Sequence, residues 1–133
     1  AMTGQFGYEF DLSKATDETI AEMKEQIALS KKIESVVHFG DMYRLDSPFE
    51  TDCSSVEFLS EDKNTAVLFH CCTLGKINGA PHFVKMSGLD RASEYACEET
   101  GEVFSGAVLE DVGLAFRHSK DFESWIYIFH KQK

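Results

Sequence analysis

The stretch Ser124-Trp-Ile-Tyr-Ile-Phe-His130 decides the fold class, because it is the strongest strand signal in the sequence. It is built from aromatic and β-branched side chains, which strands favour. Residues 66–72 form a second, continuously apolar run that is typical of a strand in the middle of a sheet. Alternation places Trp125, Tyr127 and Phe129 on one face of the last strand. We expect this face to lie in the core, and a platform for stacking sugar rings is the less favoured alternative.

Shorter strand-like segments lie on both sides of residues 66–72, with glycine-containing turns between them. These segments cover residues 39–45, 56–60, 82–86, 93–97 and 114–117. The turn signals are Gly75, Asn78-Gly79, Gly88, Thr100-Gly101 and Gly113. Short strands at this spacing are typical of two packed sheets. We therefore predict a mainly β protein with an antiparallel, Greek-key-like β-sandwich.

One long helix is predicted before the strands, from about residue 16 to residue 34. Thr16 is a suitable N-cap, and Asp17 and Glu18 add negative charge to the first turn, where the helix dipole favours it. Apolar residues then recur at helical spacing, at Ile20, Met23 and Ile27. Such an apolar stripe needs a surface to pack against.

Composition bounds the class of partner. The 133 residues suit one domain with a small appendage, and the formal net charge of −10 disfavours nucleic acids and anionic membrane surfaces as partners. The apolar runs are far shorter than the ~20 residues that span a bilayer, and no signal-peptide pattern opens the sequence. Neutral partners, such as sugars or another protein surface, stay open.

Four cysteines occur in the chain, and none forms a C-x-x-C pair. They are Cys53, Cys71, Cys72 and Cys97. Cys71 and Cys72 are adjacent, so they would point to opposite faces of a strand. We interpret the four as reduced, mostly buried small hydrophobes of an intracellular, cytoplasmic protein, and a disulfide framework is the less favoured interpretation.

Candidate chemistry is weak. His70 and Cys72 share a strand face, so a zinc site completed by Cys53 or Cys97 is one interpretation, but a polar residue beside core thiols is favoured on the weak spacing. The sequence has no phosphate-binding glycine loop and no G-x-S-x-G elbow. Nearly all of the 23 acidic residues are expected to face solvent, including Glu9, Asp11, Asp41, Asp46, Asp52, Glu98, Glu99, Glu110 and Asp111. We therefore predict no catalytic residue, no cofactor and no metal ligand.

A family resemblance begins at Gly40-Asp-Met-Tyr-Arg-Leu-Asp-Ser-Pro-Phe-Glu50. It resembles the G-D-x-Y-R-L-x-S-P-F-E segment of bacterial α-galactosidases of glycoside hydrolase family 36. Further segments are similar to that family in the same order, so that the resemblance covers essentially the whole chain. They are Met2-Thr-Gly-Gln-Phe-Gly-Tyr-Glu-Phe-Asp11, Phe58-Leu-Ser-Glu-Asp-Lys63, Gly88-Leu-Asp90, Phe104-Ser-Gly-Ala-Val-Leu109 and Gly113-Leu114.

The resemblance implies an architecture and a division of labour. In that family a (β/α)₈ barrel precedes a small C-terminal β-sandwich, which assigns residues 1–35 to the end of the barrel and its helix and residues 36–133 to the sandwich. The family cleaves terminal α-galactosides with retention, using two aspartates, one of them in a K-W-D-x-N strand end. The single tryptophan, Trp125, lies in Ser-Trp-Ile, so that motif is missing. Cys53-Ser-Ser55 is not matched to the family's substrate-binding C-S-S-G-G-G loop, because valine and glutamate follow it.

Two functions follow as expectations. The first is a non-catalytic C-terminal domain of an α-galactosidase that supports the barrel, meets α-galactosides only through the parent enzyme, and self-associates through an apolar patch when the barrel is absent. The alternative is an independent carbohydrate-binding module. No nucleic-acid or membrane partner is expected.

Overall fold

The computed structural model describes residues 2–76 and 78–132. Ala1, Ile77 and Lys133, which belong to the two predicted regions 1–35 and 36–133, lie outside the described residues. In chain order, a 3-10 turn at Leu12–Lys14 is followed by α1 (Asp17–Phe39), β1 (Asp41–Asp46), β2 (Cys53–Leu59), β3 (Thr65–Cys72), β4 (His82–Val84), β5 (Glu94–Cys97), β6 (Val103–Ser105), α2 (Gly106–Asp111), β7 (Leu114–Phe116) and β8 (Glu123–Lys131).

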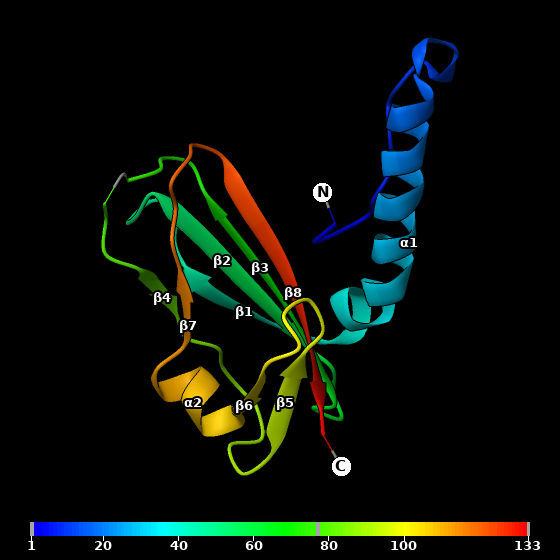
Figure 1. Cartoon of the computed structure of the whole chain (residues 1–133). Helices are drawn as coiled ribbons and strands as arrows, with labels where there is room; N and C mark the ends of the chain where they lie inside the picture. The colour runs from blue at the N-terminus through cyan, green and yellow to red at the C-terminus, as the bar shows by residue number, and fades with distance from the viewer. Residues whose placement is uncertain (1, 77, 133) are drawn as a thin grey trace.

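The strands form two antiparallel sheets (Figure 1). The larger sheet has six strands in the order β1-β2-β3-β8-β5-β6, and the smaller sheet pairs β4 with β7. β8 is a central strand, because it pairs with β3 on one side and with β5 on the other. The prediction of a mainly antiparallel β-sandwich preceded by one long helix is confirmed.

The main core fills the space between the two sheets. Alternating residues of the central strands face inward, as Leu68 of β3 and Phe129 of β8 do, and the smaller sheet contributes Val84 and Phe116. Phe129 is fully buried, and Trp125 and Tyr127 are partly buried and pack on the same cluster. The alternating aromatic row is therefore a core face, as predicted. The sugar-stacking platform is not formed by these side chains.

A second cluster lies on the opposite face of the larger sheet. The last turns of α1 place Ile33, Val36 and Val37 there, against Phe58, Val67 and Ile128. Lys32 also donates a hydrogen bond to the Glu98 carboxylate, which links the helix to the residue that follows β5. The sheet is thus covered on both faces, by the small sheet and by the end of the helix.

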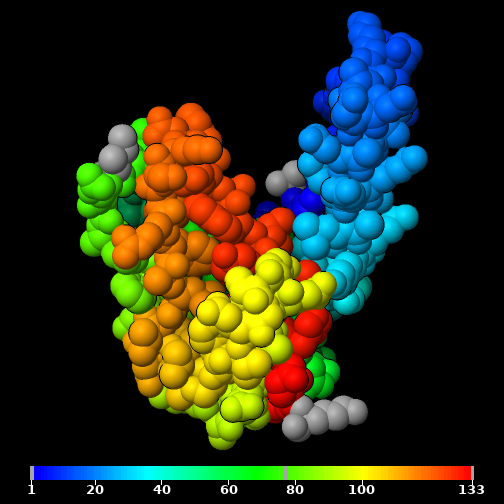
Figure 2. All heavy atoms as spheres, viewed as in Figure 1, coloured from blue at the N-terminus to red at the C-terminus, as the bar shows by residue number. Residues whose placement is uncertain are grey.

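The first turns of α1 stand clear of the sheets (Figure 2). None of the residues of α1 before Ile33 is buried. The chain before α1 lies along the helix, where the Tyr8 hydroxyl donates to Gln26. Together the two segments line an apolar groove, whose walls include Phe6, Tyr8, Phe10, Ile20, Met23 and Ile27.

α1 extends further than predicted, to Phe39 instead of about residue 34. Val36 and Val37 are weak helix formers, but packing on the sheet outweighs that intrinsic preference. Gly40 caps the helix by donating its N–H to the carbonyl of Val36. A Cβ at position 40 would lie 2.5 Å from the carbonyl oxygens of Leu59 and Val36, so the close approach of helix end to sheet requires glycine.

Besides the 3-10 turn at Leu12–Lys14, two further elements were not predicted. β6 is only three residues long, and it becomes a strand by pairing with β5. α2 follows directly, with the Ser105 hydroxyl accepting a hydrogen bond from the N–H of Val108. No helix among the described residues is both long and apolar enough to cross a membrane.

Candidate functional site

Cysteine and histidine side chains gather at one end of the sandwich, between the two sheets. Cys53 begins β2 and Cys72 ends β3, and the two are direct partners in the antiparallel register. Ser55 and His70 form the next inward-facing pair of the same two strands. His118 comes from the other layer, two residues after the end of β7. Strand alternation therefore points the side chains of Cys53, Ser55, His70 and Cys72 into the same space between the sheets. The segment after β7 adds His118 from the other layer.

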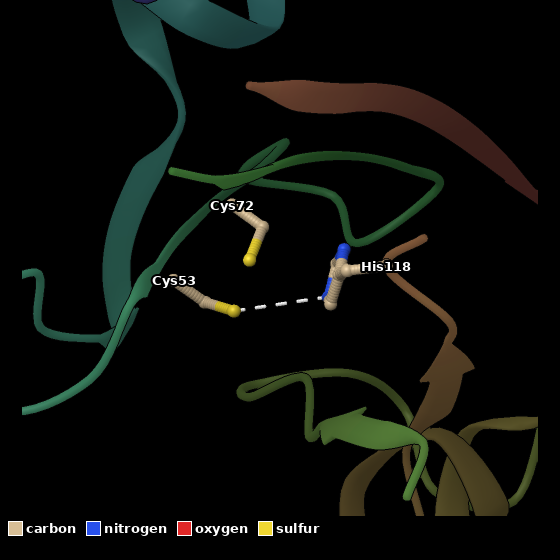
Figure 3. A group of neighbouring side chains, drawn as sticks. All are labelled: Cys53, Cys72 and His118. Atoms are coloured by element: carbon tan, nitrogen blue, oxygen red, sulfur yellow. Dashed lines mark hydrogen bonds between the residues drawn. The ribbon is translucent and has the colours of Figure 1, made fainter. Parts of the chain in front are cut away.

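Three of these residues form a compact group of donor atoms (Figure 3). The two sulfur atoms of Cys53 and Cys72 and a ring nitrogen of His118 all lie within 4.8 Å of one another. The Cys53 Sγ lies 3.7 Å from the His118 Nε2. Cys53 and Cys72 are buried and His118 is half-buried. Thiolate and imidazole groups at such spacing are the donors that bind soft divalent metals.

A chain of polar contacts continues from His118 into the sandwich. The Nε2 atoms of His118 and His70 are 3.1 Å apart, and the Nδ1 of His70 lies 2.6 Å from the Ser55 hydroxyl oxygen. Ser55 donates in turn to the Asp46 carboxylate, which also contacts the Nε2 of His82 at 3.0 Å. Because the serine proton points to Asp46, the Nδ1 of His70 must donate to Ser55. The Nε2 of a neutral His70 is then a bare acceptor aimed at His118.

Burial keeps the group uncharged. Desolvation, together with the neighbouring His118 and His82, lowers the pKa of His70 to about 4. Desolvation also lowers the pKa of His118, with His82 as the second cause. Burial raises the pKa of the Cys53 thiol to about 12, and a hydrogen bond with Cys72 adds to the shift. At neutral pH the imidazoles of His70 and His118 are neutral and the Cys53 thiol keeps its proton.

The group borders an open pocket of about 830 Å³. Its walls include Pro48, Phe49, Lys76 and Arg117. Lys76 forms an ion pair of 3.1 Å with Asp52 there, so the rim carries charges of both signs. Small solutes and ions therefore have an open approach to the sulfur atoms.

The structure brings together part of the zinc combination that the sequence allowed. Cys53 and Cys72 meet, and His70 faces the same interior one contact away, through His118. Cys97 is not in the group, because it pairs with Phe129 in the core on β5. His118 was missed, because it follows a short strand whose place depends on pairing with β4. The only signal for His118 was its residue type.

Among the described residues, Glu57 is the one Asp, Glu, Lys or Arg that is fully buried. Its Oε2 accepts from the N–H of Ser87 at 2.8 Å, and its Oε1 has no hydrogen-bond partner in the described part of the chain. Desolvation raises the pKa of Glu57 to about 8; the Ser87 N–H opposes the shift and Glu110 adds to it. Since its exposed fraction is zero, this carboxyl does not face a substrate.

Comparison with known proteins places the chain in a family. The family model described as the glycosyl hydrolase family 36 C-terminal domain matches residues 53–129. "Alpha-galactosidase AgaA" of Geobacillus stearothermophilus is 36% identical over 128 residues, which are 96% of this chain and 17% of that protein. "Probable alpha-galactosidase C" of Aspergillus oryzae is 35% identical over 131 residues, 98% of this chain and 17% of that protein.

A solved structure gives the same result. The family 36 α-galactosidase AgaB of Geobacillus stearothermophilus superposes with a TM-score of 0.95 at 34% identity, over 99% of this chain and 18% of that chain. The chain thus spans less than a fifth of the relatives it matches. The relatives include fungal as well as bacterial proteins, so the resemblance is not restricted to bacterial enzymes. The chain belongs to glycosyl hydrolase family 36, as the C-terminal domain of that family.

Proposed function

We propose that the chain supports the catalytic domain of a parent α-galactosidase and does not itself cleave glycosides. The family membership and the similarity to α-galactosidases over a small share of their length support the parent's activity. In this proposal the parent hydrolyses terminal α-galactosides with two aspartates that lie on its barrel. The chain meets the substrate only through that barrel.

The apolar groove along α1 is the observation that carries the supporting role. Side chains on its walls are strongly exposed, with 51% for Phe10 and 63% for Leu12. A solvated groove of this kind is unfavourable unless another surface covers it. We assign the barrel of the parent as that surface, because the C-terminal turns of the same helix are already fixed to the sandwich.

The test uses the full-length parent enzyme. We expect Phe10→Asp to lower the thermal stability of the barrel and the yield of active enzyme, measured by hydrolysis of a nitrophenyl α-galactoside. Phe122→Asp is the matched control, because Phe122 is 82% exposed and lies outside the groove. Equal effects of the two variants would contradict the assignment. Hydrolysis by the purified 133-residue chain would refute the non-catalytic role.

The bacterial, cytoplasmic setting is also a proposal. All four cysteines are free thiols, and three of them are buried, which supports a reducing compartment. A first alkylating reagent, added to intact cells before lysis, blocks the exposed thiols. The buried thiols of Cys53 and Cys72 should then still react with a second reagent after denaturation. A disulfide between them at that stage would contradict the proposal.

A further inference from the structure

We propose that Cys53, Cys72 and His118 bind a single zinc-class divalent cation through their two sulfur atoms and one imidazole nitrogen. The three residues come from β2, β3 and the segment after β7, so the cation would join the two sheets at their open end (Figure 3). This site is independent of the proposed support of the barrel, because strand alternation places Cys53 and Cys72 on the same face of the larger sheet as Leu59 and Leu68, opposite α1.

The distances suit tetrahedral zinc. A Zn–S bond of about 2.3 Å and a Zn–N bond of about 2.0 Å at the tetrahedral angle separate sulfur from nitrogen by roughly 3.5 Å. The Cys53 Sγ and the His118 Nε2 are 3.7 Å apart. All three donor atoms lie within 4.8 Å of one another, so small side-chain rotations complete the triangle. The fourth position opens to the pocket that the same residues line, where water supplies the last ligand.

The type of donor selects the cation. Two thiolates and an imidazole favour zinc over magnesium or calcium, which prefer oxygen ligands. Binding releases both thiol protons to solvent, and the two thiolate charges balance the charge of Zn²⁺. The cation therefore enters an enclosed place without leaving net charge there.

His70 competes with the cation for His118. In the metal-free protein the bare Nε2 of His70 accepts the Nε2–H of His118 at 3.1 Å, so this hydrogen bond must break before the same nitrogen can bind the metal. On binding, the Nε2 lone pair of His118 goes to the metal and the ring proton is carried at Nδ1. That Nδ1 is buried and has no hydrogen-bond partner in the described structure, so its lone pair is free to take up the proton.

A disulfide is the competing chemistry. Cys53 and Cys72 are direct cross-strand partners, so oxidation could join them and remove both sulfur ligands. The two outcomes are distinguishable, because a disulfide forms only with an oxidant and gives no metal spectrum. The test is therefore made on the fully reduced chain.

The experiment adds Co²⁺ and then Zn²⁺ to the reduced 133-residue chain. We expect thiolate-to-cobalt charge-transfer absorption and the visible bands of tetrahedral Co²⁺ at one equivalent, and their loss when Zn²⁺ displaces the cobalt. Competition with a chromophoric chelator gives the affinity for Zn²⁺. Cys53→Ala, Cys72→Ala and His118→Ala should each weaken the affinity for Zn²⁺ by more than about 100-fold. His70→Ala should not weaken it, because the cation then has no hydrogen bond between the two rings to displace.

Cys71→Ala is the matched control, because Cys71 is exposed on the neighbouring position and points to the other face of β3. It should leave the affinity unchanged, and thermal unfolding in a chelator should show that the variants still fold. Absence of the cobalt bands in the reduced wild-type chain would overturn the proposal even if a variant failed to fold. An equal loss of affinity in Cys71→Ala would overturn it as well.

Discussion

The two ends of α1 carry similar apolar residues in very different surroundings. At its C-terminal end Ile33, Val36 and Val37 are buried on the larger sheet, whereas at its N-terminal end Ile20 and Met23 line an open groove. The helix itself is continuous from Asp17 to Phe39. An apolar stripe on a helix therefore predicts that another surface covers it. Only the fold shows which part of the stripe is covered within this chain.

The largest expected effect compares one isoleucine from each end. Ile33→Ala should cost about 4 kcal/mol of unfolding free energy, because it leaves a cavity between helix and sheet. Ile20→Ala should cost less than about 1 kcal/mol in the same chain, because Ile20 is already in contact with solvent. Urea unfolding of the two variants measures both values. Similar losses would show that the groove is closed within the isolated chain.

The same comparison between buried and exposed positions can be made for two acidic residues, Glu57 and Glu18. The pKa of Glu57 is raised by burial to about 8, so the folded state holds a proton that the unfolded state releases near the ordinary pKa of 4.5. Stability from this residue is complete below about pH 4.5 and is lost as the pH rises through the folded pKa. Glu57→Gln removes that loss and should be more stable than the wild type at pH 9, by on the order of 3 kcal/mol.

At pH 4 the two proteins should unfold alike, because the wild-type carboxyl is protonated in both states. Glu18 gives the opposite case, since backbone and Thr16 hydrogen bonds at the exposed helix start lower its pKa. Glu18→Gln should therefore give no gain at pH 9. Thermal unfolding from pH 4 to pH 9 measures these differences, and a pH-independent gain in Glu57→Gln would contradict the assigned cause.

The smallest effect concerns association of the isolated chain through the groove. An uncovered apolar groove should promote weak self-association, which Phe10→Asp should weaken by about tenfold, or roughly 1.4 kcal/mol. Phe122→Asp should leave it unchanged. Sedimentation velocity over a range of concentrations measures the dissociation constant. A wild-type chain that stays monomeric at high concentration would contradict this prediction.

The sequence predicted best the two strands that are richest in aromatic and β-branched residues. Residues 124–130 lie within β8 and residues 66–72 within β3, and both strands carry apolar side chains on both faces of the larger sheet. The end of α1 was misplaced, since Val36 and Val37 are in the helix for tertiary reasons. β6 has three residues and exists only through its partner β5, which no local pattern could reveal.

The candidate site was predicted only in part for a similar reason. Cys72 and His70 share a strand face, which alternation alone predicts. The pairing of Cys53 with Cys72 depends on the register of β2 against β3, and the approach of His118 depends on how the small sheet stacks on the large one. Both are properties of the assembled layers, so residue spacing could suggest the donors without fixing the set.

The central position of β8 has a consequence for biosynthesis. β8 is the last described strand in the sequence, yet it is the only bridge between β1-β2-β3 and β5-β6 in the large sheet. A nascent chain therefore exposes two unfinished sheet edges until the ribosome has translated through residue 131 and those residues have left the exit tunnel. Chaperones that shield strand edges would act in that interval, and premature termination before β8 would leave fragments prone to aggregate.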